Sequence, residues 1–163
     1  MAIFKDYLEN KSPLILHGAL GTEMESLGYD ISGKLWSAKY LLEKPEVIQK
    51  IHETYVAAGA DLITTSSYQA TLPGLVEAGL TEKAAEQIIA LTVQLAKAAR
   101  DKVWGALNET EKAKRPYPLI SGDVGPYAAY LANGSEYSGD YGEITINELK
   151  DFHRPRIQIL LDQ

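Results

Sequence analysis

The stretch PEVIQKIHETYVAAGADLITTSS, residues 45–67, combines the pattern of a helix with that of a strand. Pro45 suits the first turn of a helix, where its missing N–H would have no intrahelical partner. Apolar residues then recur at helical spacing, at Val47, Ile48, Ile51, Tyr55, Val56 and Ala58. Gly59 is expected to end the helix in a left-handed conformation. Residues 60–67 have an apolar, β-branched centre and a polar end, which predicts a buried strand.

Similar elements are predicted on both sides of this unit. The short apolar run Leu14–Leu16 precedes glycine-rich residues, which predicts a first strand buried on both faces. Residues 85–103 have apolar positions on one helical face and predict a second outer helix. Residues 119–122, after two prolines, predict a third short strand. Strands that alternate with helices indicate an α/β fold built from parallel β/α units.

A third helix is predicted after residue 145. Thr145 and Glu148 have the spacing of a capping box, in which each side chain binds the backbone N–H of the other residue. The apolar positions continue to Leu161. Pro155 lies inside this segment and is expected to kink or weaken the helix, because proline removes a backbone donor and clashes with the preceding turn.

Between Tyr117 and Leu149 the chain contains no Lys or Arg, five glycines and several acidic and tyrosine residues. Connections longer than roughly 12–15 residues are usually either functional or disordered. Because disordered segments are poor in aromatic residues, the tyrosines favour a binding loop. A flexible linker is the alternative.

The composition limits the class of protein. At 163 residues, 45% apolar and 23% charged, the chain suits one globular domain. A net charge of −6 without a basic stripe argues against nucleic acid as a partner. No signal peptide or membrane span is indicated, so the cytoplasm is the expected compartment. Without cysteine, the chain cannot form disulfides or thiolate metal sites, and three scattered histidines make an internal zinc site improbable.

All three predicted strands end in polar or glycine-rich residues, namely His17-Gly18, residues 65–67 and residues 121–123. In parallel sheets, ligands bind at the carboxyl ends of the strands. One shared site is therefore predicted there. The alternative is that these residues only form the turns that follow any strand.

Six motifs in order resemble the homocysteine S-methyltransferases, and most closely the branch that uses S-methylmethionine. They are HGALGTE (17–23), LWSAK (35–39), SYQAT (67–71), GPY (125–127), GSEY (134–137) and HRP (153–155). The resemblance is colinear from Leu14 to Asp162. It implies a (β/α)8 TIM barrel, of which residues 1–163 look like the N-terminal part with the first three strands, the barrel being incomplete in this chain.

The resemblance also implies the chemistry. The family transfers a methyl group from a methyl sulfonium donor, S-methylmethionine or S-adenosylmethionine, to the thiol of homocysteine, and forms methionine. Zinc held by three cysteines from later strands binds the thiol in the intact family members. None of these cysteines is present here, so this chain alone is expected to be inactive. The alternative is a natural half-barrel that acts as a binding or assembly module and self-associates through its open edges.

Four residues in the first half of the chain match family positions for substrate. His17 and Gly18 stand at the first strand end, where the family usually has an aspartate that pairs with the amino group of homocysteine. A neutral imidazole can accept one hydrogen bond from an ammonium group, or it simply packs at the strand end. Trp36 matches a tryptophan near the methyl donor, where an indole attracts a sulfonium, although ordinary packing also explains it. Thr65 matches a position that lines the homocysteine pocket, or serves only as a β-branched strand residue.

The glycine and tyrosine segment supplies the other four candidates. Tyr127 and Tyr130 are predicted to wall the donor site, while Asp123 and Glu136 are predicted to add negative potential near a cationic ligand. The alternative is that they are surface tyrosines and solvated acids.

Overall fold

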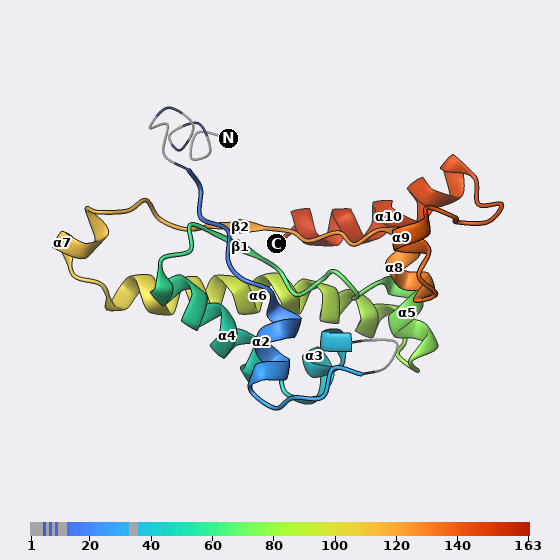
Figure 1. The fold of residues 1–163 in the computed structure, drawn as a ribbon, viewed down its shortest axis with the longest axis horizontal. Coiled ribbons are helices and arrows are strands. Elements are labelled where there is room, and N and C mark those ends of the chain that lie inside the picture. The colour runs from blue at the N-terminus through green and yellow to red at the C-terminus, as the bar shows by residue number, and fades with distance from the viewer. Residues whose placement is uncertain (1–4, 6, 8, 10–12, 33–35) are drawn as a thin grey trace.

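A computed structural model of the chain describes residues 5, 7, 9, 13–32 and 36–163 (Figure 1). Two short strands form its sheet, β1 (Leu62–Thr64) and β2 (Leu119–Ser121). They are parallel, and Ile63 pairs with Ile120. Leu16 forms a parallel bridge to Leu62 of β1. Three parallel segments separated by helices therefore confirm the predicted α/β class.

The predicted first strand is only partly correct. Residues 14–16 run beside β1, since the amide of Leu62 donates to the Ile15 carbonyl at 3.1 Å and the amide of His17 donates to the Leu62 carbonyl at 3.0 Å. However, a single bridge replaces a regular strand. Ile15 and Leu16 are 56% and 58% exposed, so the prediction of burial on both faces was wrong.

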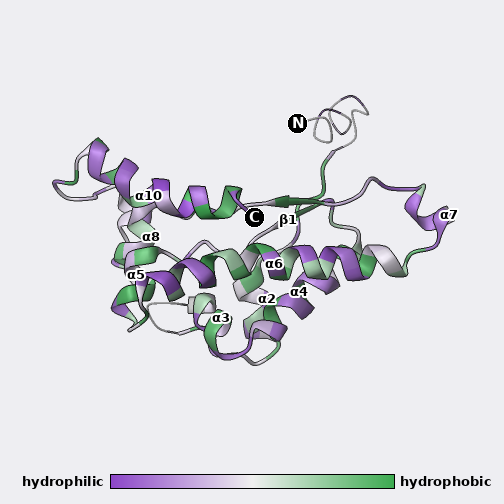
Figure 2. Ribbon diagram, turned by 180° about the vertical axis from the view of Figure 1, so that it is seen from behind, coloured by the Kyte–Doolittle hydropathy of each residue, from purple (hydrophilic) through white to green (hydrophobic). Residues whose placement is uncertain are grey.

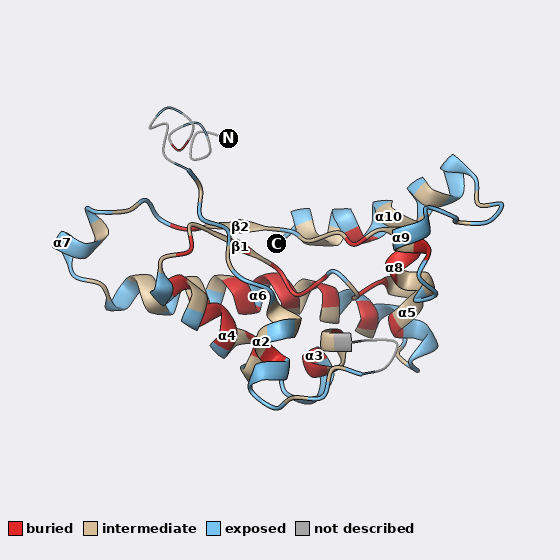
Figure 3. Cartoon of the chain, in the orientation of Figure 1, coloured by how far each residue is buried: buried red, intermediate tan, exposed pale blue. Residues whose placement is uncertain are grey.

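Two long helices form the main layer behind the sheet. α4 (Pro45–Ala58) ends at Gly59, whose φ of 109° is the predicted left-handed cap. α6 (Glu82–Ala106) packs along α4, and its N-cap Thr81 accepts a hydrogen bond from the amide of Ala84. Figure 3 shows that the buried parts of both helices include the sides that face each other. The core between them confirms the two predicted amphipathic helices, with buried Ile48, Ile51, Ala85, Ile89 and Leu95. Ala58 alone among the predicted α4 core positions is exposed.

The third predicted helix is α10 (Ile146–Leu161), which begins with the predicted capping box of Thr145 and Glu148. It contacts α6 and α8 (Tyr127–Leu131), and in Figure 1 it runs alongside the segment that follows β2. The helix continues through Pro155 without interruption. Arg156, one residue later, is its buried residue.

Shorter helices fill the connections that the sequence pattern left unassigned. They are α2 (Leu20–Ser26), the 3-10 helix η1 (Trp36–Lys39), α3 (Tyr40–Glu43), α5 (Leu72–Glu77) and α7 (Glu109–Lys112). The glycine and tyrosine segment is ordered into α8 (Tyr127–Leu131) and α9 (Ser135–Ser138). Apolar and polar residues alternate along α4, α6 and α10 in Figure 2. None of the helices described here has the length and apolar character needed to cross a bilayer.

Candidate functional site

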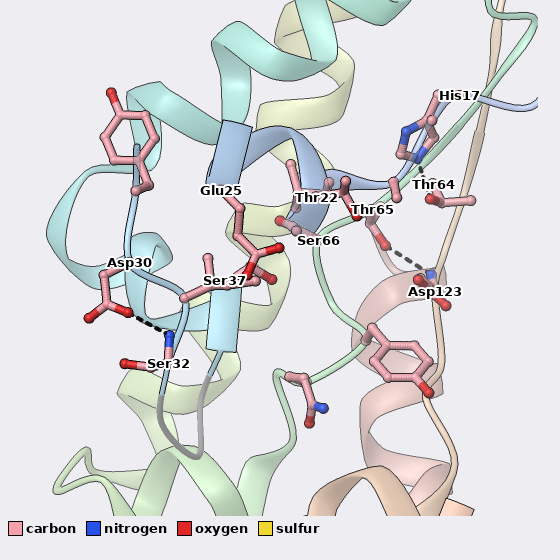
Figure 4. A pocket seen from close by; sticks show the side chains of 18 of the residues that line it. His17, Thr22, Glu25, Asp30, Ser32, Ser37, Thr64, Thr65, Ser66 and Asp123 are labelled. Carbon is pink, nitrogen blue, oxygen red and sulfur yellow. Dashed lines mark hydrogen bonds between the residues drawn. The ribbon is translucent and has the colours of Figure 1, made fainter. Parts of the chain in front are cut away.

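A cavity of about 1130 Å³ lies at the carboxyl ends of the three parallel segments (Figure 4). His17 and Gly18 line it after the first segment, Thr65 and Ser66 after β1, and Asp123 after β2. Residues of α2 and of the loop that follows it form the other side. The structure thus brings His17, Gly18, Thr65 and Asp123 together, as the shared-site interpretation predicts. Their role in binding substrate stays a prediction.

His17 lines this cavity at the end of the first parallel segment. Its Nε2 is hydrogen bonded to the Oγ1 of Thr64, while its Nδ1 is buried without a partner among the described residues. The ring packs edge-on against His52, with ring centroids 5.7 Å apart, and tilted against Tyr55. Burial lowers the pKa of His17 below its usual value, although nearby backbone groups and Asp123 oppose this effect. The imidazole is therefore neutral at neutral pH.

Gly18 allows the aromatic ring of Tyr55 to approach the backbone. A Cβ atom added at Gly18 would lie 2.7 Å from the Tyr55 hydroxyl oxygen, closer than atoms pack. That hydroxyl donates to the Ala19 carbonyl at 3.2 Å. This contact holds the entry to α2 against α4, which is a structural role for Gly18 beside its place in the cavity wall.

A closed hydrogen-bond network joins the ends of β1 and β2. The amide of Asp123 donates to Thr65 Oγ1 at 2.9 Å, and Ser67 Oγ donates to the Asp123 carbonyl at 2.6 Å. The two hydroxyl oxygens lie 2.7 Å apart and share a further hydrogen bond. Thr65 and Ser67 are both buried. The network therefore fixes the backbone of Asp123 at the floor of the cavity without using its carboxylate.

The Asp123 carboxyl group is half-buried. Burial raises the pKa of Asp123 above its usual value, while the positive charge of Arg156 and, when protonated, His17 act in the opposite direction. Among the described residues, no Lys, Arg or His nitrogen lies within ion-pair distance of this carboxylate. The cavity thus contains an unpaired and partly desolvated negative charge.

Arg156, which the sequence pattern did not single out, holds the loops around the cavity. Its guanidinium donates to the carbonyl oxygens of Ser67, Tyr68 and Gly125 at 3.4, 3.1 and 2.6 Å. Burial lowers the pKa of Arg156 to about 10, so that the side chain stays charged at neutral pH. Arg156 directly follows the motif at 153–155. The sequence could not indicate that Arg156 is buried, because the carbonyl groups that accept its hydrogen bonds belong to loops far away in the chain.

Tyr127 and Tyr130 lie in a different place. They line a separate hollow of about 570 Å³ with Phe152, and the three rings pack with centroids 5.0 to 5.7 Å apart. The hydroxyl of Tyr130 donates to Glu77, which raises the pKa of Tyr130 to about 12. The structure therefore does not bring these two tyrosines into the strand-end cavity.

Glu136 and Trp36 complete the predicted set. Glu136 is half-buried in α9, and its charge adds to burial in raising the pKa of Tyr68, whose side chain lines the cavity. Glu136 does not line the cavity itself, but it interacts with Tyr68, which does. Trp36 begins η1, and its side chain lies outside the described residues.

The side chains of the described residues do not form a zinc centre. The chain has no cysteine. Within the described ranges, no three His, Asp or Glu side chains are grouped closely enough to hold a metal ion. Thiolates and at least three convergent ligands are typical of zinc sites.

Comparison with known proteins gives consistent matches along the chain. The family model of homocysteine S-methyltransferase matches residues 14–163. Homocysteine S-methyltransferase YbgG of Bacillus subtilis is 46% identical over 149 residues, which cover 91% of this chain and 46% of that protein. Homocysteine S-methyltransferase of Escherichia coli is 43% identical over 155 residues, or 95% of this chain and 48% of that protein. The chain thus spans about half the length of these curated relatives.

A solved structure is similar as well. The crystal structure of the homocysteine methyltransferase MmuM from Escherichia coli, in its metallated form, superposes with a TM-score of 0.79 at 42% sequence identity. The match covers 96% of this chain and 52% of the MmuM chain.

Proposed function

Because the chain belongs to the homocysteine S-methyltransferase family, we propose that it forms the substrate-binding part of an enzyme that methylates homocysteine. The cavity at the strand ends is the observation that supports this most directly, because its walls come from three separate segments inside the matched region. In the proposed reaction, the thiol sulfur of homocysteine attacks the methyl carbon of a sulfonium. The bond from that carbon to the donor sulfur breaks, and methionine, the demethylated donor and a proton are formed.

The proposed donor is S-methylmethionine or S-adenosylmethionine, since both carry the required sulfonium group. The negative charge of Asp123, which lines the cavity, and that of Glu136, which interacts with Tyr68 in the cavity wall, support a cationic donor through the overall potential of the site. Negative potential in a partly enclosed cleft attracts a positively charged ligand and raises its local concentration.

We propose further that residues 1–163 are the first part of a (β/α)8 domain. The parallel order of the segment at Leu16, then β1, then β2 supports this, because successive strands of such a barrel are neighbours. The match to about half of each relative also supports it. In that arrangement, zinc would be held by residues outside this chain. The chain by itself is proposed to be inactive.

A second candidate function is a binding or assembly module. The exposed side chains of Ile15 and Leu16, next to β1, favour it, because apolar side chains beside a strand promote association. Sedimentation of the purified chain tests this candidate. A discrete and cooperatively unfolding dimer supports it, while a monomer at high concentration argues against it.

The main proposal is tested by mixing the chain with the C-terminal half of the Escherichia coli homocysteine S-methyltransferase. Methionine formed from L-homocysteine and S-methylmethionine is then measured. We expect methyl transfer from the mixture and none from either half alone. Methyl transfer by the chain alone would show that the proposed inactivity is wrong. An inactive mixture, together with a chain that does not bind L-homocysteine, would show that the proposed function is wrong.

A further inference from the structure

Three carboxylates line the strand-end cavity, and they differ in their surroundings. Glu25 and Asp30 are exposed at its rim. The carboxylate of Asp30 already has partners within the chain, since it accepts hydrogen bonds from the amide of Ser32 at 2.8 Å and from Lys39 Nζ at 3.4 Å. Asp123, at the end of β2, is the half-buried carboxylate of the three. It is therefore the carboxylate best placed to bind a ligand inside the cavity.

The surrounding polar groups hold Asp123 in position, but none of the described residues forms an ion pair with its carboxylate. Thr65 and Ser67 bind only its backbone N–H and C=O. The positive charge of Arg156 lowers the pKa of Asp123 to some extent, but its guanidinium nitrogens bind the carbonyls of Ser67, Tyr68 and Gly125 and the ring of His153 instead of the carboxylate. His17 lies on the same cavity wall and is neutral at neutral pH. A buried carboxylate is costly unless a cation pairs with it, so that a cationic ligand would be stabilised here.

Ser66 is an independent sign of a polar ligand. It lies after β1, lines the same cavity and is only 6% exposed. Its hydroxyl has no hydrogen-bond partner among the described residues. Buried hydroxyls nearly always have a partner, and a hydroxyl both donates and accepts. A ligand that carries several polar groups, such as the head group of an α-amino acid, would supply that partner.

We propose that Asp123 binds the ammonium group of the amino acid substrate and that the Ser66 hydroxyl contacts the same head group. The proposal rests on the proposed function, which identifies that amino acid as homocysteine. It assigns the ammonium contact to the end of β2 and not to His17 at the first strand end. His17 then closes the cavity behind the ligand, through its hydrogen bond to Thr64 and its packing on His52 and Tyr55.

The test compares two ligands that differ only in the amino group. L-homocysteine and 4-sulfanylbutanoate are titrated into the 163-residue chain, and binding is followed by calorimetry. We expect the wild-type chain to bind L-homocysteine at least about ten-fold more tightly than 4-sulfanylbutanoate, because a hydrogen bond to a charged group contributes about that factor in affinity. Asp123→Asn should bind both ligands about equally. Asp151→Asn, which removes an exposed carboxylate of α10, is the matched control and should keep the preference. Circular dichroism shows whether each variant is folded.

A second measurement needs no variant. The side-chain carboxyl carbon of Asp123 is followed by NMR as the pH is lowered. Bound L-homocysteine should lower the pKa of Asp123, because an adjacent ammonium favours the ionised carboxylate, and 4-sulfanylbutanoate should not.

The outcomes separate this proposal from the proposed function. If Asp123→Asn keeps the preference for L-homocysteine and His17→Gln loses it, the assignment to Asp123 is overturned while homocysteine binding stands. If the chain ignores both thiols but binds L-norvaline only when Asp123 is present, the ammonium site stands and the substrate assignment fails. If the chain binds no amino acid at all, both proposals are wrong.

Discussion

Nη2 of Arg156 lies 2.6 Å from the carbonyl oxygen of Gly125 and donates a hydrogen bond to it. The other terminal nitrogen of the same guanidinium donates to the carbonyls of Ser67 and Tyr68. One side chain of α10 thus connects the loop after β1 with the loop after β2. Both loops supply residues to the cavity, so its shape depends on a residue that does not line it.

Replacing Arg156 by methionine should destabilise the protein. Met keeps much of the volume but leaves three backbone carbonyls without their donor, and unsatisfied buried groups cost about 1–3 kcal/mol each before relaxation. We expect a loss of about 2–4 kcal/mol in the free energy of unfolding, measured with urea. Arg154→Met is the matched control, because Arg154 pairs with Asp151 on the exposed side of the helix. It should change stability by less than about 0.5 kcal/mol. Equal losses in the two variants would contradict the role of Arg156.

Gly125 is expected to tolerate no side chain. A Cβ atom there would overlap the backbone carbonyl oxygen of Tyr68 and lie 3.1 Å from its ring. Gly125→Ala should therefore cost about 1–3 kcal/mol through displaced backbone. Gly105→Ala is the control, because this glycine lies in α6 and a Cβ would meet nothing within 4 Å. Alanine is the better helix former, so the control should raise stability by about 0.5–1 kcal/mol. Thermal unfolding measures both changes, and a fall in both variants would argue against this steric reason.

The sequence was sufficient for those parts of the fold that depend on local signals. α4, α6 and α10 were predicted because apolar spacing and cap residues are read within one segment. The burial of Ile15 and Leu16 was predicted wrongly, since it depends on which elements cover the segment. An apolar run indicates that a segment tends to be buried, but it does not show which other element packs against it.

The candidate site was also predicted only in part. Parallel strands end at one edge, so His17, Thr65 and Asp123 were expected to meet and do so. Tyr127 and Tyr130 follow Asp123 closely in the sequence, yet α8 turns them toward Phe152. Spacing along an irregular segment does not define the direction of a side chain. Arg156 was missed, and Ser66 was included only as part of the polar strand end at 65–67, because the importance of both comes from burial, which only the folded chain defines.

Replacing Thr65 by valine tests the network that fixes Asp123. Valine has nearly the same shape, but the amide of Asp123 loses its acceptor, and the Ser67 hydroxyl keeps only its hydrogen bond to the Asp123 carbonyl. We expect the free energy of unfolding to fall by about 1–3 kcal/mol. L-homocysteine should also bind more weakly, because Asp123 is no longer held in place. In the control Thr54→Val, the lost hydrogen bond is to the Lys50 carbonyl on the exposed side of α4, so both quantities should stay nearly unchanged. Unaltered binding in Thr65→Val would show that this network does not position the site.

His52 should make the stability of the protein depend on pH. The ring is fully buried in α4, neither nitrogen has a partner among the described residues, and burial lowers the pKa of His52 to about 4. In the unfolded chain its pKa is near 6.5, so between pH 6.5 and 4 the unfolded state binds the extra proton. The contribution of His52 is therefore complete above about pH 6.5 and is lost as the pH falls toward 4.

His52→Leu removes this group while keeping a similar volume and a good helix former. The free energy of unfolding, measured with urea at pH 7 and pH 5, should fall less in the variant than in the wild-type chain. The expected difference is about 2 kcal/mol, because each pKa unit corresponds to about 1.4 kcal/mol. Carboxylates contribute equally to both proteins, so their effect cancels in this comparison. Identical pH dependence in the two proteins would mean that His52 takes up a proton in the folded state as easily as in the unfolded chain.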